Sequence, residues 1–262
     1  MKKGSGRRST IVRVAKLLGT AAVAALTWCG DASAALGDAA SPAAERTSVG
    51  SVEVNLVKPE GLSRVDGLCP EADAFILSLV DRFKLKVLAV YADPDQWRHF
   101  AEGLAAGAPR AIPRTAVAAT TVKMAGKSYD AKGVAKEKRR FNNWVSLAVN
   151  TRPLARLFSS KANKKLTSKL GRDLQFGYRT GQNVGKFNET AKSVSYGVLV
   201  SMTLFGLSSD VFATAAALNV GDKFIFLTWI EPDQAQSSIE RAKISSLTWL
   251  GRLTGLNQPV FE

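Results

Sequence analysis

The chain has 262 residues, of which 46% are hydrophobic, and it carries a formal net charge of +14 at neutral pH. This apolar content is ordinary for a globular protein, and the length suffices for one large domain with a sizeable core. The sequence has a single histidine, His99, and two cysteines, Cys29 and Cys69. These counts exclude a disulfide-rich scaffold, and they require that carboxylates complete any zinc site.

The chain opens with a basic segment and a short apolar run. Residues 1–16 contain six Lys or Arg and no acid, and a 12-residue apolar run, Leu17–Trp28, follows. That run is too short to cross a bilayer core, which needs about 20 residues. Together with Ala32 and Ala34, set two apart, the pattern is typical of a secretory signal peptide. We expect cleavage after Ala34, with Ala39 as a second site, and a periplasmic or secreted location.

Two other export signals match this segment less well. Cys29 is a candidate for lipid attachment, but Trp28 stands where a lipoprotein signal has a small residue. Arg7 and Arg8 resemble a twin-arginine signal, but polar residues follow them. No later apolar run is long and charge-free enough to span a bilayer, so we expect no transmembrane segment in the mature chain.

Removal of the signal peptide, residues 1–34, would leave 228 residues with a net charge of +9. Residues 35–49 are small, polar and aperiodic, so we expect a flexible leader there and a single domain over 50–258. Cys69 is then the remaining thiol, at the start of a predicted helix. Because no second cysteine or nearby histidine supports nucleophilic or redox chemistry, we interpret Cys69 as a small, half-buried residue.

Strands and helices are predicted to alternate in the first part of this domain. Alternating apolar residues predict a strand over 51–57, "SVEVNLV", and a short second strand over 62–66. We expect a helix from Pro70, which stands at a first helical position, and then a strand over 84–92. Another strand is expected over 114–124.

The helix between the last two of these strands is expected to begin at Pro94. Asp93 caps it, and Gln96 completes a capping-box pattern. Its apolar face consists of Trp97, Phe100 and Leu104. His99 lies on the same helix beside Arg98, which disfavours the protonated form that a Ser-His-Asp system requires, so we expect an exposed or interface histidine.

The second part of the domain begins with a long helical region, 131–169, broken near Pro153. Strands are then expected over 174–180, 193–206, 210–220 and 223–230. Gly221 and Asp222 join the last two in a tight hairpin. A terminal helix closes the chain, with residues at helical spacing: Ile239, Ala242, Ser246, Trp249, Leu250 and Leu253.

This order of elements predicts an α+β fold with a single antiparallel sheet flanked by helices and a long basic helical insertion in the middle. The first strand and its Pro-Gly turn, "VEVNLVKPEGLSRV", stand at one end, and "ATAAALNVGDKFIFLTW" with the helix containing "ISSLTWL" at the other. Together they resemble the PsbP-like and DcrB-like group of exported α+β domains, over about a third of the chain. The resemblance implies an antiparallel sheet sandwiched by helices, and a binding or assembly role without catalysis.

One stretch, "AGKSYD" at residues 125–130, lies where a phosphate-binding P-loop would lie, between a strand and a helix. A P-loop needs a glycine five residues before Gly126, and that position is Thr121. We therefore interpret Gly126, Lys127 and Ser128 as a polar turn and Asp130 as the N-cap of the next helix.

Acidic side chains offer no defined catalytic or metal site. Asp93 and Asp95 lack the glycine and final glutamate of a calcium loop, so they read as a helix cap. A glycosidase-type pair remains open among the acids near the first strand and helix, because spacing along the chain does not give their separation in space. These acids are Glu53, Glu60, Asp66, Glu71 and Asp73. No residue is assigned a catalytic role and no cofactor or metal is expected.

Positive charge is concentrated in one segment, Lys123–Arg172, which has 14 Lys or Arg and two acids. Within it, Val134, Phe141, Val145 and Ala148 form an apolar stripe. The basic side chains lie mostly off that stripe. The candidate anion-binding residues are Lys132, Lys136, Lys138, Arg139, Arg140, Lys161, Lys164, Lys165 and Lys169. Two interpretations stay open: the stripe packs on the sheet and the charges are only solvated, or the charges form a patch for an anionic partner.

The preferred hypothesis is an exported, non-enzymatic binding or assembly factor of the cell envelope that contacts an anionic partner through this basic helical face. The partner would be a membrane surface, an envelope polysaccharide or an acidic protein. Nucleic acid is disfavoured by export and by the scarcity of aromatic side chains suited to stacking. The alternatives are an envelope hydrolase with unidentified carboxylates and a small-ligand carrier with a pocket between sheet and helices.

Overall fold

The fold was analysed in a computed structural model, which describes residues 44–66, 68, 85–106, 113–150, 176–204 and 207–257. The expected signal peptide, the helix expected from Pro70, and Cys69 lie outside the described residues. The same holds for the second group of basic candidates: Lys161, Lys164, Lys165 and Lys169.

The described residues form two antiparallel sheets, where one was expected. The smaller is a hairpin of β1 (Glu45–Val49) and β2 (Val52–Leu56). The larger has seven strands in the order β3-β4-β5-β9-β8-β7-β6. Its strands are β3 (Ser63–Arg64), β4 (Leu85–Ala92), β5 (Thr115–Thr121), β6 (Phe176–Glu189), β7 (Ser193–Leu204), β8 (Leu207–Val220) and β9 (Lys223–Glu231). Because β1 begins at Glu45, regular structure starts earlier than the expected boundary at residue 50.

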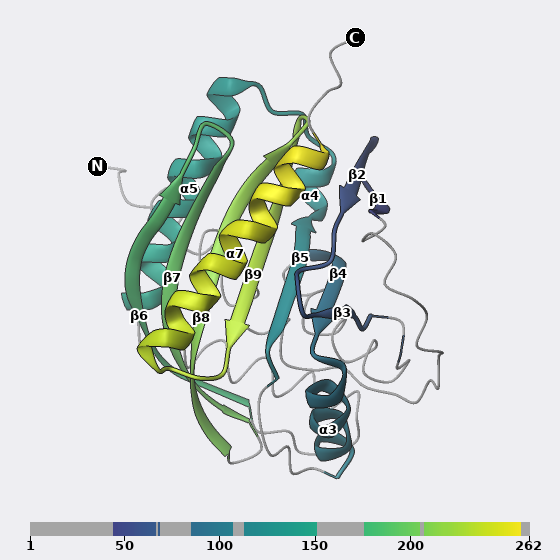
Figure 1. The fold of residues 1–262 in the computed structure, drawn as a ribbon. Coiled ribbons are helices and arrows are strands. Elements are labelled where there is room, and N and C mark those ends of the chain that lie inside the picture. The colour runs from purple at the N-terminus through teal and green to yellow at the C-terminus, as the bar shows by residue number, and fades with distance from the viewer. Residues whose placement is uncertain are drawn as a thin grey trace, which may run out of the picture.

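Two long helices cover opposite faces of the larger sheet, α5 (Ala131–Asn150) and α7 (Gln236–Leu256), as Figure 1 shows. Side chains alternate between the two faces of a strand, so neighbouring residues of β8 face different helices. Ala215 and Ala217 belong to the core cluster with α5, whereas Ala216 and Leu218 belong to the cluster with α7. The α+β class and the antiparallel sheet between helices are therefore present in the structure.

The terminal helix α7 packs as its periodicity predicts. Its buried residues include Ala242, Ser246, Trp249, Leu250 and Leu253, and Ile239 is partly buried against the same cluster. The Trp249 ring lies edge-on to Tyr91 at 5.9 Å, and its Nε1 donates a hydrogen bond of 2.7 Å to the Val57 carbonyl oxygen. One side chain thus ties the segment after β2 to the larger sheet.

The short helix α3 (Pro94–Ala105) is capped at its start as expected. The Asp93 carboxylate accepts hydrogen bonds from the backbone N–H groups of Asp95 and Gln96, at 3.1 and 3.0 Å. The Gln96 side chain accepts from the backbone of Arg114, at 3.2 Å, and so ties α3 to the start of β5. Trp97 and Phe100 are buried, as their spacing predicts.

Strand boundaries differ from the prediction, most clearly at the ends of β5 and β6. The strand expected over 114–124 ends at Thr121, because the Thr121 hydroxyl accepts a hydrogen bond of 3.0 Å from the Met124 N–H and starts α4 (Val122–Ala125). Strand β6 continues to Glu189, beyond the expected end at residue 180. It is an edge strand with three register irregularities, and Gly185 adopts φ +117° beside one of them. Such a strand lacks the regular alternation of apolar and polar residues that predicts a strand from sequence.

Candidate functional site

The apolar stripe of α5 is part of the protein core. Val134, Phe141 and Val145 are buried in the cluster that α5 forms with β7, β8 and β9. The Phe141 ring stacks on Phe226 at 5.8 Å and tilts against Tyr196 at 6.0 Å. The expectation that the stripe packs on the sheet is therefore confirmed for these three residues.

The segment before α5 is a polar turn, and hydrogen bonds join it to the β8–β9 turn and to the start of α5. The Lys127 carbonyl oxygen accepts from the buried ammonium of Lys223, at 3.0 Å. The Asp130 carboxylate accepts from the Gly133 N–H, at 2.7 Å, and caps α5 as predicted. The Tyr129 N–H donates to the Asp222 carbonyl oxygen, at 3.0 Å, which fixes the start of the helix to the β8–β9 turn.

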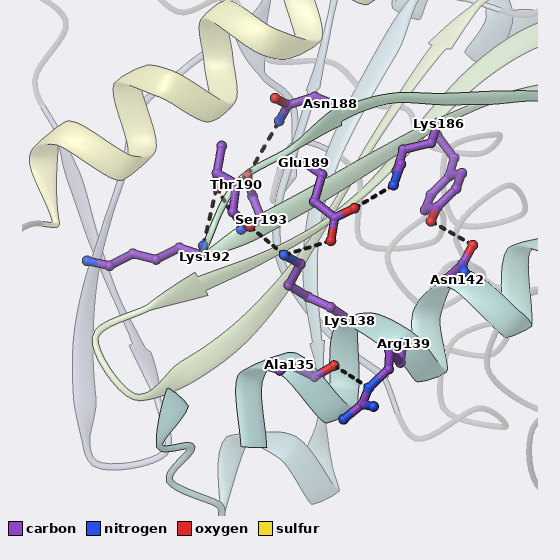
Figure 2. A network of polar contacts seen from close by, with 11 residues as sticks. Ala135, Lys138, Arg139, Asn142, Lys186, Asn188, Glu189, Thr190, Lys192 and Ser193 are labelled. Atoms are coloured by element: carbon purple, nitrogen blue, oxygen red, sulfur yellow. Dashed lines mark hydrogen bonds and ion pairs between the residues drawn. The ribbon is translucent and has the colours of Figure 1, made fainter. Parts of the chain in front are cut away.

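Three of the predicted basic residues, Lys132, Lys136 and Arg139, are exposed on α5. Their spacing of four and three residues aligns them along one side of the helix. That side is opposite the buried stripe, since one turn takes 3.6 residues. Within the described part of the chain, none of the three forms an ion pair with an acid, and Arg139 donates to its own helix at the Ala135 carbonyl oxygen, 3.3 Å away (Figure 2).

Lys138, also predicted as an anion-binding residue, does not belong to this exposed line. Its side chain is 11% exposed and forms an ion pair of 3.0 Å with Glu189. It also donates to the Thr190 carbonyl oxygen, so that it joins α5 to the end of β6 (Figure 2). The physical reason is its position four residues after Val134, which turns it toward the sheet.

Arg140 is exposed, like Lys132 and Lys136, but it is paired with an acid, like Lys138. Its side chain is 60% exposed but forms an ion pair with Glu137, three residues earlier on the helix, whose side chain is 14% exposed. Because Arg140 is paired with an acid in this way, we leave it out of the group formed by Lys132, Lys136 and Arg139, which is called the α5 basic line below.

A small polar network fixes the orientation of α5 on the sheet. Glu189 lies between Lys186 and Lys138, and hydrogen bonds from these two lysines lower the pKa of its carboxyl group. The pKa of Lys186 is raised in turn by its hydrogen bond to Glu189. Further along the helix, the Tyr196 hydroxyl donates a bond of 2.7 Å to the Asn142 side chain. These contacts hold the α5 basic line away from the sheet.

Sequence reasoning did not find Glu189 or the exposed Lys192 of the β6–β7 turn. The positions of both residues depend on where β6 ends, and that strand was expected to end at residue 180. The stretch "NETAKS" carries a usable signal, since Asn and Ser are common in tight turns and Thr hydroxyl groups form similar turn bonds. In the structure, Thr190 and Ser193 hydroxyl groups lie 2.8 Å apart and close this turn.

Among the residues that the structure describes, the other candidate chemistries do not converge on one site. His99 is exposed, with Nδ1 2.8 Å from the Asp95 carbonyl oxygen. Of the acids considered as a pair, Glu53 lies 3.9 Å from Arg46, Asp66 forms an ion pair with Arg64, and Glu60 is exposed. Glu71 and Asp73 lie outside the described residues. Within the described ranges, no three His, Cys, Asp or Glu side chains gather in a way that could hold a metal ion.

None of the helices in the described part of the chain has the length and apolar character to span a membrane. No family model matches the chain, and no curated protein matches it. Among solved structures, the chain is similar to the solution structure of cyanobacterial PsbP (CyanoP) from Synechocystis sp. PCC 6803, with 12% identity and a TM-score of 0.30, over 84% of this chain and 96% of that one. At this TM-score the likeness is weak, and neither the family nor the function of the chain follows from it.

Proposed function

We propose that the protein is an exported, non-enzymatic binding or assembly factor of the cell envelope, and that it contacts an anionic partner through the α5 basic line. The observation that supports this most is the division of α5 into two sides. One side is buried through Val134, Phe141 and Val145. The opposite side carries three exposed cations that pair with no acid in the described part of the chain.

The anchoring of α5 makes this line suitable for binding. Lys132 and Arg139 lie seven residues apart, which is about 10 Å along a helix. The ion pair of Lys138 and the hydrogen bond of Asn142 fix the helix backbone on the sheet. A partner therefore meets cations whose backbone positions are already ordered, which reduces the entropy lost on binding.

The remaining parts of the proposal rest on the sequence. Export follows from the signal-peptide pattern of residues 1–34. The non-enzymatic role follows from the resemblance of the two ends of the domain to exported binding domains. Location outside the cytoplasm favours anionic lipid, polysaccharide or protein over nucleic acid as the partner.

The test is a triple variant, Lys132→Gln with Lys136→Gln and Arg139→Gln, compared with the parent protein. Binding would be measured to anionic vesicles, to an acidic polysaccharide and to an acidic protein. The matched control removes three charges from α7, on the other face of the sheet: Arg241→Gln, Lys243→Gln and Arg252→Gln. We expect the α5 variant to lose affinity for at least one probe and the α7 variant to keep it. Equal affinity of both variants and the parent for every probe would overturn the proposal.

A further inference from the structure

One end of the larger sheet, the upper end in Figure 1, gathers turns that are far apart in the sequence. The Asn219 N–H donates to the Lys192 carbonyl oxygen, at 2.8 Å, so the β6–β7 turn lies beside the end of β8. Lys223, after the β8–β9 turn, donates to the Lys127 carbonyl oxygen. Gly50, in the β1–β2 turn, is so close to α4 that a Cβ there would stand 2.0 Å from the Ala125 carbonyl oxygen. This group of turns is called the turn end.

The turn end is held together by buried polar contacts. The Lys223 ammonium, on a side chain only 4% exposed, lies 3.5 Å from the Asp222 carboxylate and 3.4 Å from the Ser128 hydroxyl. A hydrogen bond from Ser128 and the charge of Lys223 lower the pKa of Asp222, with the hydrogen bond as the larger cause. These contacts join the turns into one surface whose cations keep fixed relative positions.

Exposed lysines reach this surface from three places in the sequence. They are Lys123 on α4, Lys127 in the following turn, and Lys192 in the β6–β7 turn, and none forms an ion pair within the described ranges. Lys132, the first residue of the α5 basic line, is exposed in the first turn of α5. The acids nearby are already engaged, since Asp130 caps α5 and Asp222 lies beside Lys223.

An exposed apolar side chain lies among these lysines. Val122 is 62% exposed at the start of α4, directly before Lys123. Apolar side chains flanked by lysines are typical of surfaces that bind at the lipid–water boundary, where the apolar group leaves water and the cations meet lipid phosphates. A polysaccharide or an acidic protein segment would satisfy the charges but offers no such apolar layer.

We infer that the anionic partner is a bilayer rich in anionic phospholipid, and that the turn end is the part of the protein that meets it, with Val122 at the boundary. This inference rests on the proposed function and names the partner class. Each lysine near such a surface contributes about fivefold to partitioning. Lys123, Lys127 and Lys192 together then contribute on the order of a hundredfold.

The first experiment is co-sedimentation with vesicles of phosphatidylglycerol and phosphatidylcholine, and with phosphatidylcholine alone. All variants would have the same N-terminal form as the parent, so that residues 1–34 contribute equally or are equally absent. We expect Lys123→Gln with Lys127→Gln and Lys192→Gln to weaken partitioning on the order of a hundredfold, with no binding to phosphatidylcholine alone. Circular dichroism spectra like those of the parent would show that the variant is folded.

The second experiment tests the apolar contact with a matched pair. Val122→Ser and Ile244→Ser remove side chains of almost equal exposure, 62% and 63%, but Ile244 lies on α7. We expect Val122→Ser to weaken vesicle partitioning several-fold and Ile244→Ser to leave it unchanged. Equal effects of these two changes would overturn the role of Val122 at the boundary.

Two outcomes would overturn the inference and leave the proposed function standing. In one, the α5 variant loses vesicle binding and the turn-end variant does not. In the other, the parent binds an acidic polysaccharide or protein but no vesicle. If parent and variants bind no anionic probe of any kind, the inference and the proposed function both fail.

Discussion

Helices α5 and α7 cover the same sheet from opposite sides and have 20 and 21 residues, but they are attached to it by different means. α7 is held by a continuous buried face and by buried hydrogen bonds, such as the 2.8 Å bond that the Thr214 hydroxyl donates to Ser246. α5 is held by a narrow apolar stripe and by the ion pair of Lys138 with Glu189 at its margin.

The outward sides of the two helices differ as well. On α7, Lys243 has a side chain that is 22% exposed, and it forms an ion pair of 2.9 Å with Glu240 on the same helix. On α5, the basic line has no acid as a partner within the described residues. The difference teaches that α7 is attached mainly through its buried face, whereas α5 presents its basic line at a fixed place on the sheet. The predictions below test that contrast.

The largest effect is expected at Trp249. Trp249→Ala removes a fully buried ring and its hydrogen bond to Val57, so we expect a loss of about 3–5 kcal/mol in the free energy of unfolding. Denaturant unfolding would measure it. Trp249→Phe, which keeps a ring but not the donor, should cost less. A loss below about 1 kcal/mol for Trp249→Ala would show that α7 is not the main structural helix.

On α5, the buried aromatic residue that corresponds to Trp249 is Phe141. Because it packs on Phe226 and Tyr196, Phe141→Ala should lower the free energy of unfolding by about 3 kcal/mol. We expect vesicle binding of the folded fraction to stay unchanged, since the ring is buried. A stable variant that no longer binds vesicles would mean that the stripe inserts into the membrane, which would reverse the roles of the two sides of α5.

A smaller effect is expected at Glu189. The lowered pKa of this carboxyl group means that its ionised form is favoured in the folded state, so its contribution is present above the unfolded pKa of about 4.3 and is lost as the pH falls through the folded value. Glu189→Gln should therefore reduce the loss of stability between neutral pH and acid. Thermal unfolding of parent and variant at several pH values would show it, and identical pH profiles would contradict the pairing.

The sequence was sufficient to predict α7 but only the first part of β6. The terminal helix has large apolar residues at helical spacing, and Trp249 and Leu253 are buried where that spacing puts them. Strand β6 contains three glycines and two asparagines, and its extended form depends on pairing with β7. β1 was missed for the same reason, since its pairing with β2 decides its conformation.

The candidate site could be predicted only in outline. The charge pattern of α5 located Lys132, Lys136 and Arg139 correctly on an exposed side. It could not separate Lys138 from them, because Glu189 is distant in the sequence and its position depends on the β6–β7 turn. Lys192 was missed because the packing of separate turns, and no local pattern, brings it beside the end of β8.

The most direct test of the central claim is the salt dependence of binding in the α5 triple variant, in which Lys132, Lys136 and Arg139 are replaced by Gln. We expect its free energy of unfolding to change by less than about 1 kcal/mol, because exposed charges contribute little to stability. Its affinity for the anionic probe that the parent binds should fall, and the remaining affinity should depend less on salt, because fewer charges are screened. An unchanged affinity with an unchanged salt dependence would show that the α5 basic line is only solvated.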